Sequence, residues 1–420
     1  MNKSAFLPLL FVCLFPAISC LGQSEFDNLL ALGKEEFSKD FQDQDFAKAV
    51  ENLEKAVALN PDSQEAHYFL GYAYDRLNSK DGASLIDAKL DLTNKAIAAF
   101  QRVIEINPKY EGEKIVLDPY SKFTSLTGSI AWSYIAKGQL DSARWAFKMG
   151  RDIGGFQEPL LEHTRNILDN CSENSILIMN GDMIMFPITY VQLMEGYRTD
   201  VTTIDNGLLA ANWYIEHLHR QDPDILGLDI ETAIELEYLE WQGKDVTLEV
   251  ASEKYPDISS FTWYLKPTYY DQYLLKNNIM LLSILKKNQF KKEVFFSTGF
   301  DPNGKLSLNA YLRKAGLVEH FVPSKVVNDI FAADYDNILM NFKTETLQKN
   351  RKIIENSYDL NMILNNYRFY FINRIRHYQD NKQDKQARQL KTFYKNNLSE
   401  KVYPYAEQST KDYLLEILER

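Results

Sequence analysis

The sequence predicts a mixed α + α/β fold, with helical hairpins at both ends and a central small α/β domain that has a mostly parallel sheet. Two segments near the start share one helical pattern, the middle of the chain has strand–helix–strand periodicity, and the end is helical in character. The predicted boundaries are a signal peptide at 1–22, helical repeats at 24–156, an α/β domain at 160–330 and a helical region at 331–420.

The start of the chain has the pattern of an export signal. Lys3 supplies a positive charge, Phe6–Phe15 is an apolar stretch, and Ala17–Cys20 is a small-residue cleavage site. Two processing routes remain open, because an imperfect lipobox would make Cys20 the lipidated N-terminus, whereas ordinary signal peptidase would cut near Gly22. No later apolar run approaches the roughly 20 residues that span a bilayer. We therefore expect an exported protein, periplasmic or outer-membrane-associated, with lipid as its only membrane anchor.

Two N-terminal segments, Phe46–Pro61 and Thr93–Pro108, share one helical pattern and both stop at Asn-Pro. The helix that precedes the second segment is recognisable at His67–Tyr74, where Gly71 would allow a neighbouring helix to approach closely. These segments resemble tetratricopeptide repeats (TPR), in which paired helices stack. They lie farther apart than the roughly 34 residues of one such repeat, so an inserted surface loop is expected around Asn78–Asp91.

A third unit of the same pattern covers Ile130–Gly150, with its inter-helix turn at Gly138-Gln139. Three units are about the minimum for a stable stack. The resemblance implies a concave groove that binds proteins or peptides. The residues predicted at this groove are His67, Tyr68, Tyr74 and Tyr134.

The middle of the chain predicts the start of an α/β domain. The unbroken apolar run Ile176–Met179 suits a buried strand, and Asn180–Asp182 suits a turn. Pro187 suits a first helical position, and Gly196 suits the residue after a helix. A second strand at Val201–Asp205 would return parallel to the first, because a crossover of this length normally does so.

The remaining elements follow from shorter apolar patterns. Further strands are expected at Asp245–Val250, Ser260–Leu265 and Lys292–Thr298. Helices are expected at Leu160–Asp169, Ala211–His219, Asp271–Asn288 and Asn309–Ala315. The C-terminal region should contain a helix that begins at Asn366, an antiparallel partner at Asp384–Tyr394 and a capping segment at Tyr413–Leu418.

Several motifs in the central part occur together in one known family. They are Asn180-Gly181-Asp182, Phe186-Pro187, Glu195-Gly196, Arg198-Thr199-Asp200-Val201, Leu208-Leu209 and Trp213-Tyr214, then Val294-Phe295-Phe296, Tyr311, Gly316-Leu317-Val318 and Val322-Pro323. On these residues the segment resembles the soluble C-terminal region of a bacterial family of multi-pass membrane proteins related to protein O-mannosyltransferases. Any glycosyl transfer in that family would belong to its multi-pass region, and this sequence has helical repeats in that place. The resemblance therefore implies an accessory portion.

Polar residues near the ends of the two predicted strands form the candidate binding site, namely Asn180, Gly181, Asp182, Arg198, Asp200 and Asp205. Open α/β sheets place ligands at strand ends, so these residues would form a small cleft for a sugar, a nucleotide or a peptide end. A structural alternative has more weight. In it Asp182 caps the following helix, Asp205 begins a turn and Arg198 pairs with a neighbouring carboxylate.

No catalytic, cofactor or metal site is predicted. The sequence has neither a Gly-rich phosphate loop nor a nucleophile elbow. His217 and His219 would point apart on a helix, so they do not readily bind one ion. Cys171, the one cysteine outside the leader, is expected to be a buried inert thiol. The net charge of −11 argues against nucleic acid, because contacts to phosphates need clustered cations.

These patterns predict an exported, non-catalytic interaction protein of the bacterial cell envelope, without a cofactor, that binds protein or peptide partners through its helical repeats. One alternative is an accessory sugar- or nucleotide-sugar-binding module linked to envelope glycosylation. A third possibility, a scaffold for a membrane-embedded glycosyltransferase, overlaps the first.

Overall fold

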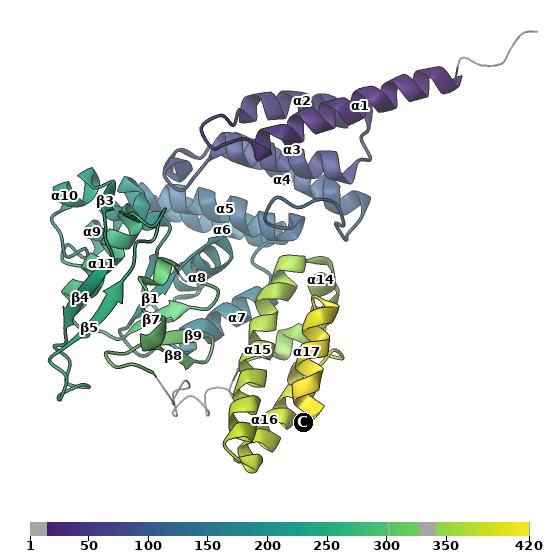
Figure 1. The fold of residues 1–420 in the computed structure, drawn as a ribbon. Coiled ribbons are helices and arrows are strands. Elements are labelled where there is room, and N and C mark those ends of the chain that lie inside the picture. Colours follow the sequence, from purple (N-terminus) through teal and green to yellow (C-terminus); the bar gives the residue numbers. More distant parts are fainter. Residues whose placement is uncertain (1–14, 301–302, 327–341, 420) are drawn as a thin grey trace, which may run out of the picture.

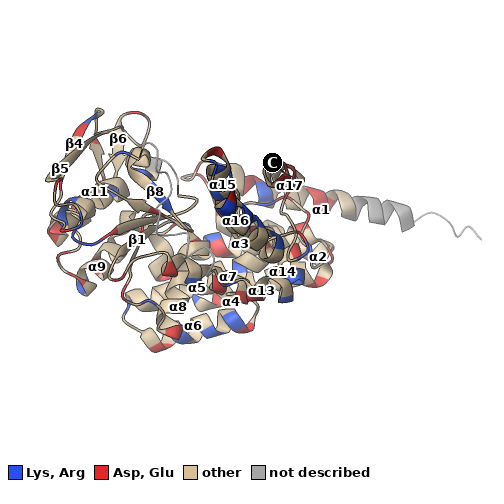
Figure 2. Cartoon of the chain, turned by 90° about the horizontal axis from the view of Figure 1, so that it is seen from below, with Lys and Arg blue, Asp and Glu red and all other residues tan. Residues whose placement is uncertain are grey.

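The computed structural model describes residues 15–300, 303–326 and 342–419 (Figure 1). Most of the predicted signal peptide lies outside these residues. The side chain of the lipidation candidate Cys20 is not among those described. The described chain has N-terminal helical hairpins, a central sheet covered by helices, and C-terminal helices, which confirms the predicted fold class. Basic and acidic side chains are interspersed along the helices (Figure 2).

The N-terminal helices pack as consecutive pairs. They are α1 (Phe15–Ser38) with α2 (Phe46–Leu59), α3 (Gln64–Asn78) with α4 (Leu90–Ile106), and α5 (Pro119–Ala136) with α6 (Leu140–Asp152). Side-chain caps begin several of them, since Asp45 accepts a hydrogen bond from the backbone of Lys48 and Ser63 from that of Ala66. A Cβ at Gly71 would lie 2.7 Å from the ring of Phe100, so the close helix approach expected there is present.

The insertion between α3 and α4 is a loop at the surface, as predicted, but part of it packs against the rest of the protein. It contains a 3₁₀ turn, η1 (Ser84–Asp87), whose Leu85 is buried against α5. The carbonyl of Gly82 accepts a hydrogen bond of 2.9 Å from Trp213 Nε1, and that of Ile86 accepts one of 2.7 Å from Ser133 Oγ. The insertion therefore joins the repeat helices to the α/β domain.

The central sheet has the strand order β2-β1-β7-β9-β8. Its strands are β1 (Ile176–Met179), β2 (Thr202–Asp205), β7 (Val294–Ser297), β8 (Leu312–Ala315) and β9 (Val318–Phe321). β1 pairs in parallel with β2, as predicted, and also with β7, whereas β9 and β8 form an antiparallel hairpin at the other edge. Every residue of β1 and β7 is buried, which explains their continuous apolar sequence.

Helices and two small ribbons surround this sheet (Figure 1). The helices are α7 (Glu158–Asp169), α8 (Asp182–Glu195), α9 (Asn212–Gln221), α10 (Ile230–Glu235) and α11 (Lys276–Asn288), and the 3₁₀ turns are η2 (Leu208–Ala210), η3 (Asn303–Lys305) and η4 (Asn309–Tyr311). The ribbons pair β3 (Tyr238–Glu240) with β6 (Tyr273–Leu275), and β4 (Lys244–Glu249) with β5 (Ser260–Leu265).

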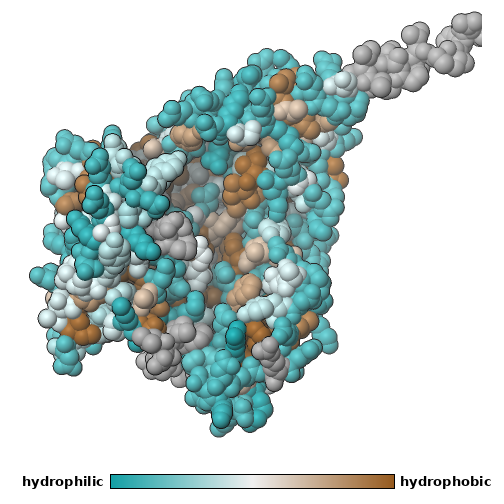
Figure 3. Space-filling model, viewed as in Figure 1, coloured by the Kyte–Doolittle hydropathy of each residue, from teal (hydrophilic) through white to brown (hydrophobic). Residues whose placement is uncertain are grey.

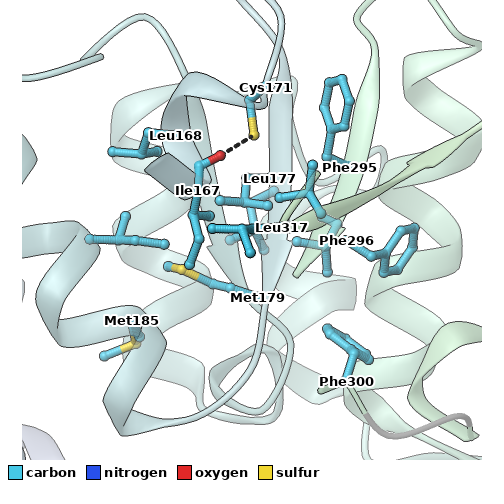
Figure 4. Close-up of a cluster of buried hydrophobic side chains, with 14 of the residues drawn as sticks. Ile167, Leu168, Cys171, Leu177, Met179, Met185, Phe295, Phe296, Phe300 and Leu317 are labelled. Atoms are coloured by element: carbon cyan, nitrogen blue, oxygen red, sulfur yellow. Dashed lines mark hydrogen bonds between the residues drawn. The ribbon is translucent and has the colours of Figure 1, made fainter. Parts of the chain in front are cut away.

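One apolar core joins β1 and β7 to α7 and α8 (Figure 4). Cys171 belongs to it, and its thiol donates a hydrogen bond of 3.6 Å to the carbonyl oxygen of Ile167. Burial raises the pKa of this thiol far above its ordinary value. Cys171 is therefore the buried thiol that the sequence predicts, in its inert protonated form.

Three predicted element boundaries in the α/β domain are wrong. α8 begins at Asp182, where Gly181 adopts a φ of 96°, so Pro187 lies inside the helix. Asn309–Ala315 is η4 followed by strand β8, because pairing with β9 buries Leu312 and Ala315. The pattern at Asp271–Asn288 combines strand β6 with α11, and short apolar runs of this kind do not distinguish strands from helices.

The C-terminal region is α13 (Glu345–Lys349), α14 (Arg351–Asn356), α15 (Tyr358–Asp380), α16 (Asp384–Asn397) and α17 (Gln408–Glu419). α15 and α16 form the predicted hairpin, but α15 begins well before Asn366, where Ser357 caps it by accepting from the backbone of Leu360. The surface is hollowed between the α/β domain and the helices beside it, and hydrophobic residues line part of the hollow (Figure 3).

Candidate functional site

A cavity of about 330 Å³ lies where the β1–α8 turn meets the repeat helices. Asn180, Gly181, Asp182 and Asp205 line it from the α/β domain, so the structure brings four of the predicted binding residues together. The carboxyl ends of β1 and β2 and the N-terminus of α8 all reach this cavity, which is where open parallel sheets place ligands. Residues of α3, α5 and η1 form the opposite wall.

A chain of polar contacts runs along the wall of the cavity from α3 to α8. The Nζ of Lys122 lies 2.7 Å from Asp75 Oδ2 and 3.4 Å from Ser125 Oγ. The hydroxyl of Ser125 donates a hydrogen bond of 2.6 Å to Asp182 Oδ2. Lys122 is 3% exposed, and its ammonium lies 4.7 Å from the ring centroid of Tyr72. The buried cation is thus held by one carboxylate and one aromatic face.

Asp205 supports the turns around the cavity. Its carboxylate accepts hydrogen bonds from the backbone of Gly181 at 3.1 Å and of Leu208 at 3.0 Å. Burial raises the pKa of Asp205 to about 6, although these backbone donors oppose the shift. Asp182 was expected to cap α8, but its carboxylate makes no capping hydrogen bond. It accepts a hydrogen bond from Ser125 instead.

Arg198 and Asp200 lie at the opposite end of the strands, before the amino end of β2. Arg198 Nε lies 2.9 Å from Asp200 Oδ1, and its guanidinium also donates to the carbonyls of Leu168, Cys171 and Ser172. This guanidinium lowers the pKa of Asp200 to about 2. The pair ties the segment before β2 to the segment before β1, so placing it in one site with Asp182 was wrong.

The predicted groove residues have different environments. Tyr74 is buried and donates to Glu54, His67 Nε2 lies 3.0 Å from the carbonyl of Pro61, and Tyr134 packs half-buried against the core. Tyr68 instead contacts the linker between α4 and α5, because its ring stacks on Tyr110 with centroids 4.3 Å apart.

The linker packs against α3, and its backbone bends at Ile115–Leu117. The hydroxyl of Tyr68 accepts from the backbone of Ile115 at 3.0 Å and donates to the carbonyl of Leu117 at 2.9 Å. The hydroxyl of Tyr72 contacts both the N–H and the carbonyl of the same Leu117. Tyr72 and the linker were missed from the sequence, although the apolar run Ile115–Leu117 between two Pro-containing stops was a visible signal.

Other chemistry is not indicated in the described part of the chain. No three His, Cys, Asp or Glu side chains there are arranged to hold a metal ion. His217 packs edge-on against Trp132, with ring centroids 5.3 Å apart. Among these residues, every helix is too short or too polar for a membrane span.

Comparison with known proteins assigns two parts of the chain. The model of the TPR repeat matches residues 39–78, so the N-terminal part is of the TPR class. The model described as TMEM260-associated domain 2 matches residues 161–255 and 250–342. The mouse protein O-mannosyl-transferase TMEM260 is 28% identical over 64 residues, which are 15% of this chain and 9% of the mouse protein. No solved structure matches. Both resemblances expected from the sequence are therefore confirmed, and the TPR match indicates protein partners.

Proposed function

We propose that this chain is an exported, non-catalytic adaptor of the bacterial cell envelope that binds protein segments in its TPR groove and serves envelope glycosylation. The TPR match and the linker bound along α3 support the first part. The similarity of the central part to TMEM260-associated domain 2, and the transferase named in the mouse relative, support the link to glycosylation.

The linker is the observation that carries the proposal. Tyr68 and Tyr72 bind its backbone atoms, so the groove holds the linker with little dependence on linker side chains. At one end of the groove, Lys34 adds ion pairs of 2.5 Å to Glu113 of the linker and to Glu65 of α3. A segment of a partner protein that displaced the linker and took its conformation would meet the same donors and acceptors.

A synthetic peptide of residues 109–118 should therefore bind the groove once the linker is removed. In a variant whose residues 109–117 are replaced by a Gly/Ser segment of equal length, we expect micromolar binding by calorimetry, and much weaker binding to the intact chain. Adding Tyr68→Phe and Tyr72→Phe should weaken binding about tenfold, because the hydroxyl contacts are lost. Tyr134→Phe is the matched control. Equal binding to the intact and linker-replaced chains would contradict the proposal.

Export predicts a shortened N-terminus. Mass spectrometry of the chain isolated from envelope fractions should find either a lipid-modified Cys20 or a chain that begins near Gly22. If Cys20 carries the lipid, Cys20→Ser should release the protein from membranes into the soluble fraction. A mature chain that still begins at Met1 would exclude the exported adaptor.

The alternative of an accessory sugar- or nucleotide-sugar-binding module is favoured by one observation. Asn180, Gly181 and Asp182, which belong to the central motif, line the cavity instead of packing in the core. This module would lie next to the groove, because Tyr72, Val116 and Leu117 line the cavity and Tyr68 does not.

A further inference from the structure

The geometry points to a binding site for a neutral, hydroxyl-rich ring, such as one monosaccharide unit, in the cavity between α3, α5 and the β1–α8 turn. It goes beyond peptide binding and develops the sugar-binding alternative. Neither family match covers the wall formed by Lys122 and Ser125, which belong to α5.

The charges around the cavity disfavour anionic ligands. The acidic residues in its wall are Asp75, Asp81, Asp182 and Asp205, and the basic residues are Arg76 and Lys122. Carboxylates thus outnumber cations, and the buried ammonium of Lys122 already pairs with Asp75. A phosphate would meet repulsion without an unpaired buried cation in return, whereas a neutral ligand would not.

The polar groups along the cavity wall are placed to bind the hydroxyls of a ligand. Each hydroxyl can donate one hydrogen bond and accept others, so it is best held between an acceptor and a donor. The chain from Asp75 through Lys122 and Ser125 to Asp182 has a carboxylate at each end and two donors between them. Two neighbouring hydroxyls of one ring can each meet such a pair. Asp182 is exposed at the mouth of the cavity, where its carboxylate is accessible to a ligand.

The apolar part of the wall and the size of the cavity favour one ring. Phe186 and Met185 are buried behind the polar chain, and Val116, 60% exposed, lies at the rim. These side chains offer apolar contact to ring C–H groups. A volume of about 330 Å³ is near the lower limit of small-molecule pockets, so it suits a monosaccharide better than a nucleotide-sugar.

The ligand would bridge two parts of the molecule. Lys122 and Ser125 lie on α5 of the repeat region, while Asp182 begins α8 of the α/β domain. Occupancy should therefore raise the melting temperature of the full chain, because a ligand that binds only the folded state stabilises it.

The test uses the full-length protein with mannose, glucose, galactose and N-acetylglucosamine in separate arms, and with UDP and inorganic phosphate as anionic arms. Thermal shift and saturation-transfer NMR should detect at least one monosaccharide at millimolar concentration. Asp182→Asn and Ser125→Ala should each weaken it about tenfold, since the first removes the charge of an acceptor and the second removes a hydroxyl that donates to a carboxylate. The exposed Asp224→Asn is the matched control and should bind like the natural sequence.

Three results would overturn the inference: no monosaccharide binds, only UDP or phosphate binds, or both cavity variants bind sugar as the control does. The peptide experiment has a separate readout. Tyr68→Phe should impair peptide binding and leave sugar binding intact, so failure of one proposal does not imply failure of the other.

Discussion

Arg368→Ala is expected to destabilise the C-terminal helices by about 5 kcal/mol, among the largest effects that a single substitution has. Arg368 is fully buried, yet its partners are neutral. The guanidinium donates to the carbonyl oxygens of Leu398, Tyr403 and Pro404 at 2.8, 2.6 and 2.9 Å. Truncation would leave these carbonyls without donors inside the protein, and each such group costs about 1–3 kcal/mol.

Packing adds to the loss. The guanidinium lies between the rings of Tyr403 and Tyr405, 3.7 and 3.8 Å from their centroids, so alanine would also leave a cavity. Arg368→Lys should retain only a small part of the stability, because an ammonium cannot reproduce the planar set of donors. Chemical denaturation, monitored by far-ultraviolet circular dichroism, would measure the stability of both variants.

Arg376→Ala is the control for this prediction. Arg376 lies on the same helix with a side chain that is 56% exposed, and its ion pair with Asp380 is long, at 3.9 Å. Its removal should change stability by less than about 0.5 kcal/mol. If Arg368→Ala unfolds at the same denaturant concentration as Arg376→Ala, the central role of Arg368 in this region is refuted.

Local patterns predicted the structure correctly where residues that are close in sequence determine it. The apolar run Ile176–Met179 gave a buried parallel strand, and Gly196 ends α8 with a φ of 64°. Pro187 misled the prediction of the helix start, because the positive φ of Gly181 begins the helix earlier. Such local errors shift a boundary without changing the fold.

The candidate site could be predicted only in part, because half of it comes from another region. The turn Asn180–Asp182 and Asp205 were found from strand ends, but Lys122 and Ser125 reach the cavity only because α5 docks on α8. A Cβ at Gly128 would lie 2.3 Å from Phe186, so this docking depends on a glycine whose partner is distant in sequence. Periodicity along one helix carries no information about such a partner.

A pair of carboxyl groups connects the linker to the C-terminal helices. Asp118, which ends the linker, is buried, and its carboxylate caps α5 by accepting from Tyr120 and Ser121. It also accepts from the backbone of Asp359 and the hydroxyl of Ser357, each at 2.8 Å. Asp359 accepts in return from the backbone of Asp118.

Because of this pair, one contribution to the stability of the protein should fall as the pH rises. Burial and the carboxylate of Asp118 raise the pKa of Asp359 from 3.8 to about 7, so the folded protein binds a proton that the unfolded chain releases. The contribution is complete below about pH 4 and is lost as the pH rises through about 7, with a size of about 2 kcal/mol after solvent screening. The raised pKa of Asp205 acts in the same direction.

Asp359→Asn separates the contribution of Asp359 from that of Asp205. The amide keeps an acceptor for the backbone of Asp118 but has no charge, so the variant should melt higher than the natural sequence at about pH 8 and similarly at about pH 5. The lost attraction between a carboxylate and the N-terminus of α15 opposes this, but it contributes only about 0.3–1 kcal/mol. Asp380→Asn, with a side chain 71% exposed on the same helix, is the control. Equal slopes of melting temperature against pH for all three proteins would show that the two carboxyls do not couple the linker to α15.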